Sequence, residues 1–249
     1  MERLIGGLKA PISRVGGKRL LKKRIIAEFP DGYEEMTYVE PFIGGGSVFY
    51  AKKPSQKEVI NDLDKAIYNI HKGLQQYGEK IGKDLVGYYT PDDFYRFVKK
   101  HPTTALGRLS LFLLLNRISF MGQGETPKNK EGTNVKADFS PYEARLKDTT
   151  ITNKDYRTVM SRYDSPNTLF YLDPPYEGSS KQHYDHPDFD LNELHDYLKR
   201  LEGKWIVSMN DSPNVRKIFH DYPIKTVTTT YQLPVPHKVK EVIIKNFKK

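Results

Sequence analysis

The chain has 249 residues, a formal net charge of +9 and no cysteine. This length allows one sizeable hydrophobic core plus an insertion. Without cysteine the chain forms no disulfide framework, no thiolate-ligated zinc site and no iron–sulfur cluster, and it has no cysteine nucleophile. The positive charge suits a polyanionic partner and equally a lysine-rich, solvated surface.

No segment of the sequence indicates contact with a membrane. The longest apolar run, residues 109–115, is much shorter than the roughly 20 residues that span a bilayer. The first residues, MERLIGG, lack the apolar region of a signal peptide. We therefore expect a soluble, cytoplasmic, globular protein.

The first part of the chain predicts alternating strands and helices. A β-prone run at residues 37–39 precedes a glycine turn and an expected helix start at residues 44–51. Residues 58–62 predict the next strand, and the apolar residues of segment 63–74 recur at helical spacing. Residues 36–77 thus predict a βαβα unit of a parallel sheet.

The pattern changes over residues 78–150. Thr90 and Pro91 predict the N-terminus of a helix, and the apolar residues 106–115 predict a second helix. Residues 117–145 are polar and contain glycine, so we expect a long loop there, and a loop of that length inside a compact domain is usually functional. The segment is expected to be a mostly helical insertion.

Alternation resumes after the insertion. The predicted elements, in chain order, are a strand at 168–172, a helix at 191–201 opened by Asp190 and Glu193, a strand at 205–208, a helix from Ser212 and Pro213 to about residue 220, and two closing strands at 226–232 and 239–247, joined by residues 233–236. The sequence therefore predicts one α/β domain with one insertion.

Two features at the ends of predicted strands favour a nucleoside cofactor, because open parallel sheets bind ligands at the carboxyl ends of their strands. The glycines of the turn at residues 40–46 (EPFIGGG) let a ligand approach the backbone closely. Asp62 follows that turn by about 20 residues, a position from which an acid accepts hydrogen bonds from ribose hydroxyls. The pattern leaves open a dinucleotide, another adenosine cofactor or a plain tight turn.

The third feature is Asp173-Pro174-Pro175-Tyr176, which directly follows a hydrophobic strand. An exocyclic aromatic amine is a poor nucleophile because its lone pair is conjugated with the ring. The Asp173 carboxylate and the Pro174 carbonyl can accept the two amine protons, and the prolines hold these acceptors rigidly. Tyr176 offers a flat face to the base. The tetrapeptide therefore predicts transfer to a nucleobase amine, and an ordinary proline turn is the alternative.

Several co-linear motifs resemble those of the Dam-type (D12 class) DNA adenine-N6 methyltransferases over nearly the whole chain. They are GGKRLL at 16–21, VEPFIGGGSVF at 39–49, IND at 60–62, DPPY at 173–176, SMNDS at 208–212 and EVIIKN at 241–246. The resemblance implies a Rossmann-like, S-adenosylmethionine-dependent methyltransferase sheet of seven strands whose last strand is antiparallel. Residues 1–77 and 151–249 would then form the catalytic domain, and residues 78–150 the insertion for target recognition.

The resemblance also implies the reaction. A site-specific enzyme of this kind, as in restriction-modification systems, transfers a methyl group from S-adenosylmethionine to N6 of an adenine flipped out of double-stranded DNA. Extruding the base costs a few kcal/mol. Direct transfer needs no covalent intermediate. No metal is expected, since the spacing of His183 and His186 matches no metal-ligand motif. The loop 177–188 is expected to close over the base. We expect a monomer or weak dimer, bacterial or encoded by a phage or other virus.

By position, the resemblance assigns residues to three roles. The expected catalytic residues are Asp173, Pro174, Pro175 and Tyr176. The expected cofactor-binding residues are Arg14, Gly16, Lys18, Glu40, Phe42, Gly44, Gly46, Asp62, Asp155 and Asp173. The expected DNA-binding residues are Arg117, Phe120, Met121, Glu125, Lys128, Lys130 and Lys136.

Some assignments carry alternatives. The family usually has an aromatic residue at the position of Arg14, and Asp155 either binds the cofactor adenine or is a surface acid. Phe120 either wedges between base steps or closes a core, and Arg117 contacts phosphate or guanine. The three lysines contact phosphates or form a solvated loop. Relatives often have Asn and Arg at the positions of Met121 and Glu125, so the resemblance does not imply GATC as the target.

Three other functions compete with this one. Methyltransferases that act on cytosine N4 or protein glutamine usually begin the motif with Asn or Ser, whereas this chain has Asp173. A dehydrogenase that binds NAD at the glycine turn would leave the motif at 173–176 unexplained. A DNA-binding relative that has lost catalysis is the third alternative, and the intact motif disfavours it.

Overall fold

The computed structural model describes residues 7–14, 18–175, 189–231 and 237–248, without the side chains of residues 82–84, 231 and 237. The chain divides into two compact units. The first unit comprises residues 1–19, 44–53 and 65–151, and the second comprises residues 20–43, 54–64 and 152–249. Among the described helices, none combines the length and the hydropathy that a bilayer crossing requires.

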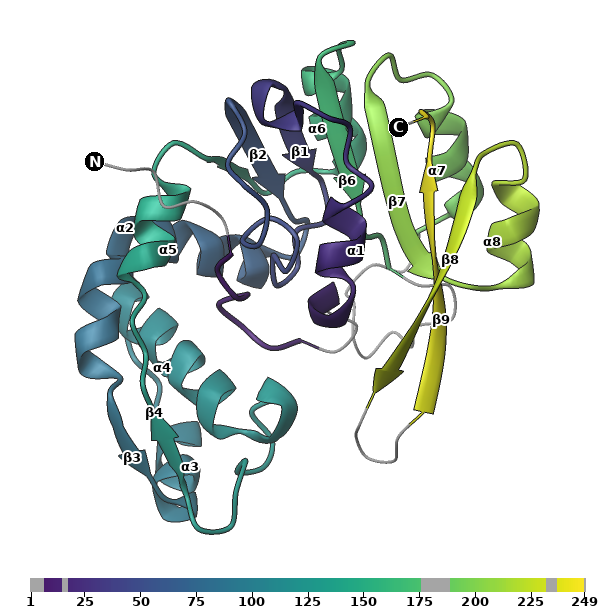
Figure 1. Ribbon diagram of the computed structural model, residues 1–249. Coiled ribbons are helices and arrows are strands. Elements are labelled where there is room, and N and C mark those ends of the chain that lie inside the picture. The colour runs from purple at the N-terminus through teal and green to yellow at the C-terminus, as the bar shows by residue number, and fades with distance from the viewer. Residues whose placement is uncertain (1–6, 15–17, 176–188, 232–236, 249) are drawn as a thin grey trace. The chain divides into compact units, whose positions relative to one another are not determined.

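The second unit is organised around a seven-stranded sheet, of which only residues 150 and 151, in a strand at one side, belong to the first unit (Figure 1). Its strands are β1 (Thr37–Glu40), β2 (Lys57–Asn61), β5 (Thr150–Thr152), β6 (Thr168–Leu172), β7 (Lys204–Asn210), β8 (Ile224–Tyr231) and β9 (His237–Lys245). The order across the sheet is β5-β2-β1-β6-β7-β9-β8. Strands β2, β1, β6 and β7 run parallel, whereas β9 runs antiparallel to both of its neighbours. The predicted α/β fold, with its last strand antiparallel, is confirmed.

Helices cover both faces of this sheet. They are α1 (Lys22–Ile26), α6 (Tyr156–Tyr163), α7 (Leu191–Leu198) and α8 (Pro213–Ile218), with the 3-10 turn η2 (Tyr33–Glu35). Side chains of α6, α7 and α8 form one buried cluster with Val39, Phe170 and Trp205 of the strands. On the other face, the ring of Phe29 packs against Tyr38 at 5.9 Å between centroids. Burial of this apolar surface is the main force that holds the sheet and helices together.

The first unit is mostly helical. It contains α2 (Lys65–Asp84), α3 (Pro91–Val98), α4 (Ala105–Ile118), α5 (Ser140–Leu146), the antiparallel strands β3 (Gly87–Tyr89) and β4 (Thr133–Val135), and the turn η3 (Phe120–Gly122). Another 3-10 turn, η1 (Lys18–Leu20), follows the N-terminal segment. Helix α2 packs against α4 and α5. The boundary expected near residue 78 falls inside α2, and the division into catalytic and target-recognition parts stays a prediction.

The predicted starts of α3, α7 and α8 are confirmed by their capping contacts. Thr90 Oγ1 accepts a hydrogen bond from the Asp93 N–H at 3.2 Å, and the Asp93 carboxylate accepts one from the Thr90 N–H at 2.9 Å. The carboxylate of Asp190 caps α7, and the hydroxyl of Ser212 accepts from Val215 N–H to cap α8. Each such cap satisfies a backbone donor that the helix leaves unpaired, which stabilises it by about 1 kcal/mol.

Two expectations are wrong. Residues 47–51 form turns and not the expected helix start, because the chain there closes only isolated turns, such as Tyr50 N–H to Gly46 O. The predicted glycine turn before them is present, with positive φ at Gly44 and Gly46. Residues 117–145 are not a structureless loop, since they contain η3, β4 and α5. These elements have no periodic apolar pattern in the sequence, because a short strand and a two-turn helix bury only a few side chains each.

Candidate active site

The candidate site lies at the carboxyl edge of the sheet in the second unit. Strands β2, β1 and β6 are parallel neighbours, in register from Thr37 opposite both Lys57 and Thr168. Their carboxyl ends therefore meet at one edge, which the arrowheads mark in Figure 1. Glu40 ends β1, Asp62 follows β2 and Asp173 follows β6. The fold thus brings three of the predicted site carboxylates to one edge of the sheet.

Asn61 ties the loops at this edge together. Its side chain is buried, and its Nδ2 donates to Pro41 O at 2.9 Å and to Lys154 O at 2.8 Å. Its Oδ1 accepts from Thr152 Oγ1 at 2.8 Å and from Lys154 N–H at 2.9 Å. One amide therefore fixes the loop after β1 and the loop before α6 relative to the end of β2. Asn61 belongs to the motif at 60–62 but had no predicted role, and an Asn within a β-prone run was the available signal.

The backbone of Asp62 is fixed by hydrogen bonds to Thr152 and Asn153, and its carboxylate is not buried. Its N–H donates to Thr152 O at 3.3 Å, and its carbonyl accepts from Asn153 Nδ2 at 2.8 Å. Its carboxylate accepts from the Asp64 N–H at 3.0 Å, and the residue is partly exposed. Asn153, for which the sequence predicted no role, therefore helps to fix the position from which Asp62 presents its side chain.

Glu40 is a buried carboxylate. Only 2% of its surface is exposed, and its Oε2 accepts a hydrogen bond from the Tyr38 hydroxyl at 2.6 Å. Burial and the nearby Glu40 charge raise the pKa of Tyr38 well above its usual value, so this hydroxyl keeps its proton. On the neighbouring strands, the hydroxyl groups of Tyr171 and Ser208 are 2.8 Å apart. Two buried polar pairs, Tyr38 with Glu40 and Tyr171 with Ser208, thus lie within the strands β1, β6 and β7 that lead to this edge.

Phe42 contributes an aromatic wall. Its ring lies 5.2 Å from Tyr156 and 6.1 Å from Phe189, centroid to centroid, and it is partly buried against the core cluster. Burial, reinforced by the charge of Glu193, raises the pKa of Tyr156 to about 12. The three rings form an apolar group beside the polar end of β1.

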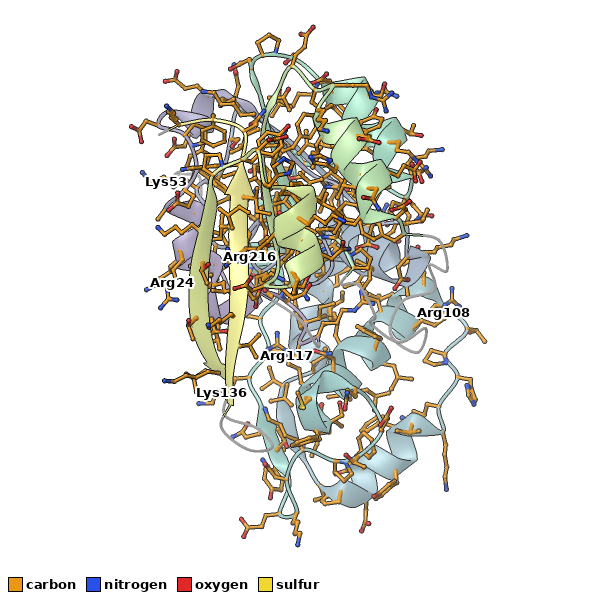
Figure 2. The ribbon with its side chains drawn as sticks, turned by 90° about the vertical axis from the view of Figure 1, so that its right-hand side faces the viewer. Arg24, Lys53, Arg108, Arg117, Lys136 and Arg216 are labelled. Carbon is orange, nitrogen blue, oxygen red and sulfur yellow. The ribbon has the colours of Figure 1, made fainter. Side chains whose placement is uncertain are left out.

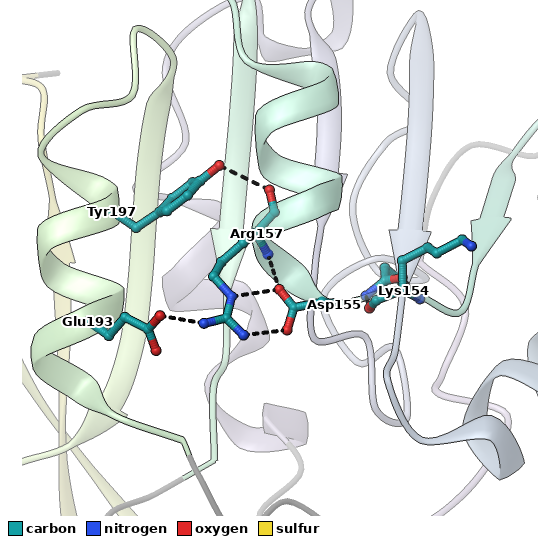
Figure 3. A network of polar contacts seen from close by, with 6 residues as sticks. Lys154, Asp155, Arg157, Glu193 and Tyr197 are labelled. Atoms are coloured by element: carbon teal, nitrogen blue, oxygen red, sulfur yellow. Dashed lines mark hydrogen bonds and ion pairs between the residues drawn. The ribbon is translucent and has the colours of Figure 1, made fainter.

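Asp155 caps α6 and is engaged by an arginine (Figure 3). Its Oδ1 accepts from Arg157 N–H at 2.9 Å and Arg157 Nε at 2.8 Å, and its Oδ2 accepts from Arg157 Nη2 at 2.8 Å. The same guanidinium donates to Glu193, and Tyr197 donates to Arg157 O at 3.0 Å. The carboxylate therefore has a local structural partner, and its predicted contact with a cofactor adenine stays a prediction.

The DPPY motif begins where β6 ends. Asp173 is partly exposed, Pro174 is buried and Pro175 is partly exposed. Tyr176 lies outside the described residues, as do Gly16, the predicted closing loop 177–188 with its two histidines, and the link 233–236. The described part of the motif thus presents an acid at the sheet edge, directly after a strand that is buried throughout.

The first unit carries the remaining predicted cofactor residues. Gly44 and Gly46 have φ values of 47° and 74°, so the turn that follows Ile43 uses conformations that favour glycine. Lys18 lies in η1 with 3% of its surface exposed, and Arg14 is partly buried. A buried lysine needs partners that compensate for its lost hydration. The burial of Lys18 is therefore typical of a residue with a binding or structural role and not of a solvated surface lysine.

The expected DNA-probing hairpin is a tight loop after α4. Ser119 pairs with Pro127 in an antiparallel bridge, and Phe120 N–H donates to Thr126 O at 2.8 Å. At its tip, Phe120 and Met121 are 41% and 44% exposed, and Met121 has the unusual φ of 52°. Phe120 is therefore not a core aromatic.

Asn116 anchors this loop from inside the unit. Its Nδ2 donates to Gly122 O at 2.9 Å and to Ser13 O at 3.0 Å, and its Oδ1 accepts from Ser13 N–H at 2.9 Å. A side chain at Gly122 would meet Asn116 Nδ2 at 2.6 Å, so only glycine fits. The anchoring holds two apolar side chains in water, a costly arrangement that is typical of contact surfaces.

The other predicted DNA contacts differ in exposure. Arg117 donates from Nη2 to Pro11 O at 3.1 Å and lies 5.4 Å from the Phe139 ring centroid, so it already has contacts inside the unit. The remaining side chains are exposed, and they are Glu125, Lys128, Lys130 and Lys136 (Lys136 and Arg117 are labelled in Figure 2). Within the described residues, no group of three or more side chains is arranged to hold a metal ion.

The sequence was also compared with known proteins. The family model described as D12 class N6 adenine-specific DNA methyltransferase matches residues 15–233. The chain belongs to this family. The predicted family and enzyme class are therefore confirmed, and the match includes both the glycine turn and the DPPY motif.

Individual relatives agree with the family assignment. The chain is 24% identical, over 93% of each protein, to the type II methyltransferase M1.LlaDCHI of Lactococcus lactis subsp. cremoris. It is 23% identical to the type II methyltransferase M.CviBI of Paramecium bursaria Chlorella virus NC1A, over 86% of this chain and 88% of that protein. Among solved structures, an rRNA methylase from Streptococcus thermophilus aligns with a TM-score of 0.41 and 12% identity over 95% of this chain and all of that one, which is too remote to inform function.

Proposed function

We propose that this protein is a site-specific DNA methyltransferase that transfers a methyl group from S-adenosylmethionine to N6 of an adenine flipped out of duplex DNA. The observation that carries the proposal is the position of Asp173-Pro174 at the carboxyl end of β6, beside the end of β1 that leads into the glycine turn. Membership of the D12 class supplies the reaction and the target atom.

The residues at the sheet edge suit this methyl donor. Asp62 is partly exposed at the end of β2, where its carboxylate can accept hydrogen bonds from both ribose hydroxyls. The buried carboxylate of Glu40 offers a counter-charge to the ammonium group of S-adenosylmethionine, and the ring of Phe42 offers this donor an apolar face. We assign supporting roles to the other predicted positions, which are Arg14, Gly16, Lys18, Gly44, Gly46 and Asp155.

Asp173 and Pro174 activate the amine. Their carboxylate and carbonyl oxygens accept the two N6 protons, which draws the nitrogen lone pair out of conjugation with the purine ring. S-adenosylmethionine, when bound, supplies a methyl group on a positively charged sulfur. Asp173 is also suited to accept the proton that the nitrogen releases after transfer. Because β6 and the prolines fix both acceptors, alignment contributes much of the rate enhancement.

DNA recognition is assigned to the first unit. The exposed pair Phe120 and Met121 at the loop tip supplies an apolar wedge, and Lys128, Lys130 and Lys136 supply charges for phosphates. Tyr176 is assigned to stack on the extruded base, which recovers roughly 1–3 kcal/mol.

The reaction is tested with purified protein, tritium-labelled S-adenosylmethionine and DNA from a bacterium that lacks DNA methylation. We expect label in N6-methyladenine after nucleoside analysis, and modification-sensitive sequencing then gives the target site. Label in N4-methylcytosine would overturn the choice of base. Binding of DNA and methyl donor without any labelled nucleoside would support the catalytically inactive alternative.

Phe120→Ala is expected to raise the Kd for duplex DNA about tenfold, because base–aromatic contacts are worth roughly 1–3 kcal/mol. The side chain is exposed, so the urea unfolding midpoint is expected to stay within error of wild type. Phe112→Ala is the matched control, since Phe112 lies on α4 and is 40% exposed against 41% for Phe120. Equal DNA affinity of the two variants would remove the wedge role from Phe120.

A further inference from the structure

A histidine on α2 holds a carbonyl of the glycine turn. The side chain of His71 is fully buried, and its Nε2 donates to Gly44 O at 2.8 Å. Its Nδ1 lies 2.9 Å from the hydroxyl oxygen of Tyr50. All three residues belong to the first unit. The turn is thus fastened from α2 by a polar side chain with no access to solvent.

The contacts define the state of the ring. A carbonyl only accepts, so Nε2 carries a proton. Burial lowers the pKa of His71 to about 4, so the ring is neutral near pH 7 and Nδ1 is its acceptor. The Tyr50 hydroxyl therefore donates to Nδ1. Every polar atom of the imidazole is paired, which fixes both its tautomer and its orientation.

Tyr50 also supports the other end of the turn. Its backbone N–H donates to Gly46 O at 3.0 Å, and its ring packs so closely on Gly46 that a Cβ there would lie 2.6 Å from Cε2. The rings of Tyr50 and His71 are stacked, with centroids 5.8 Å apart. The carbonyls of Gly44 and Gly46 are thus both held by residues of the protein.

Holding a carbonyl also sets the direction of an amide proton. A peptide unit is planar and trans, so the N–H of Gly45 points opposite to the carbonyl of Gly44. With that carbonyl directed at His71, the Gly45 N–H points away from His71. Glycine residues alone would leave this direction loosely defined, because their backbone is conformationally permissive.

We propose that His71 is a positioning residue for the methyl donor: by holding the Gly44 carbonyl, it aims the Gly45 N–H at the donor's carboxylate group. The inference rests on the proposed function, because it assumes that the glycine turn binds the amino-acid end of S-adenosylmethionine. His71 does not touch the donor. It acts through the peptide between Gly44 and Gly45. Because this peptide is already ordered, binding of the donor does not have to meet the conformational entropy cost of ordering it.

The test compares three variants by titration with S-adenosylmethionine. His71→Leu removes both hydrogen bonds, and we expect its Kd to rise about tenfold or more, as for loss of a buried hydrogen bond. His71→Gln places an amide N–H near the position of Nε2, and its Kd is expected to return to within about threefold of wild type. The Kd for DNA is expected to change by less than about twofold in both. Leu74→Ala, at a fully buried position one turn along α2, is the control for general destabilisation.

The outcomes separate this role from the proposed function. A wild-type protein that does not bind S-adenosylmethionine would refute both. Normal binding by wild type and by His71→Leu would refute the role of His71 alone. The role would also be overturned if Leu74→Ala, at an equal loss of urea midpoint, weakened donor binding as much as His71→Leu, or if His71→Gln restored nothing.

Discussion

Asp173→Ala is expected to lower the turnover number for adenine methylation by at least ~10²-fold, comparable to loss of one preorganised electrostatic group. The side chain is partly exposed at the end of β6, so its removal leaves no core cavity. The Kd values for DNA and S-adenosylmethionine are expected to change far less than the turnover number, because the carboxylate matters most when the amine nitrogen changes geometry. Single-turnover methylation with saturating substrates measures the effect directly.

A matched control for this variant lies one strand away. Asp211 follows β7, and its carboxylate accepts from Arg216 Nε at 2.6 Å and Nη2 at 2.9 Å, which lowers its pKa. Asp211→Asn keeps the shape of that side chain, and we expect turnover within about twofold of wild type, as for substitutions away from the reacting atoms. Near-normal turnover of Asp173→Ala would refute the assigned role of the motif.

Asn61→Ala is expected to lower the free energy of unfolding by about 3 kcal/mol, because it deprives several buried backbone groups of hydrogen bonds. The carbonyls of Pro41 and Lys154 lose their donor, and Lys154 N–H loses its acceptor. The loops at the ends of β1 and β5 lose their common anchor, so the Kd for S-adenosylmethionine is expected to rise as well. Urea unfolding and a binding titration give the two numbers.

Asn153→Ala provides the comparison for this prediction. Its Nδ2 donates to Asp62 O and Leu63 O, each at 2.8 Å, but Asn153 is partly exposed, so water can replace these bonds. We expect it to cost less than about 1 kcal/mol of unfolding free energy. Equal losses for the two variants would show that the hydrogen bonds of Asn61 stabilise the fold no more than those of a partly exposed loop residue, which would refute its role as the anchor of the edge.

Much of the candidate site was predictable because its signals are local. A β-prone run followed at once by an acid or by glycines marks a strand end, and Asp62 and Asp173 were found in this way. Asn61 and His71 were not found, since an Asn in a strand and a His in a helix gain their meaning from partners far along the chain. Asn61 depends on Lys154, and His71 on Gly44.

Residue patterns within short windows determined the strands of the second unit except β5, the caps of α3, α7 and α8, and the order of the motifs, because periodicity and capping depend on neighbours in sequence. Only the tertiary structure decided that β9 lies between β7 and β8, that residues 47–51 form turns, and that Phe120 stands exposed. These features depend on contacts between residues distant in the chain, and such contacts override local preference whenever they bury more surface or satisfy more hydrogen bonds.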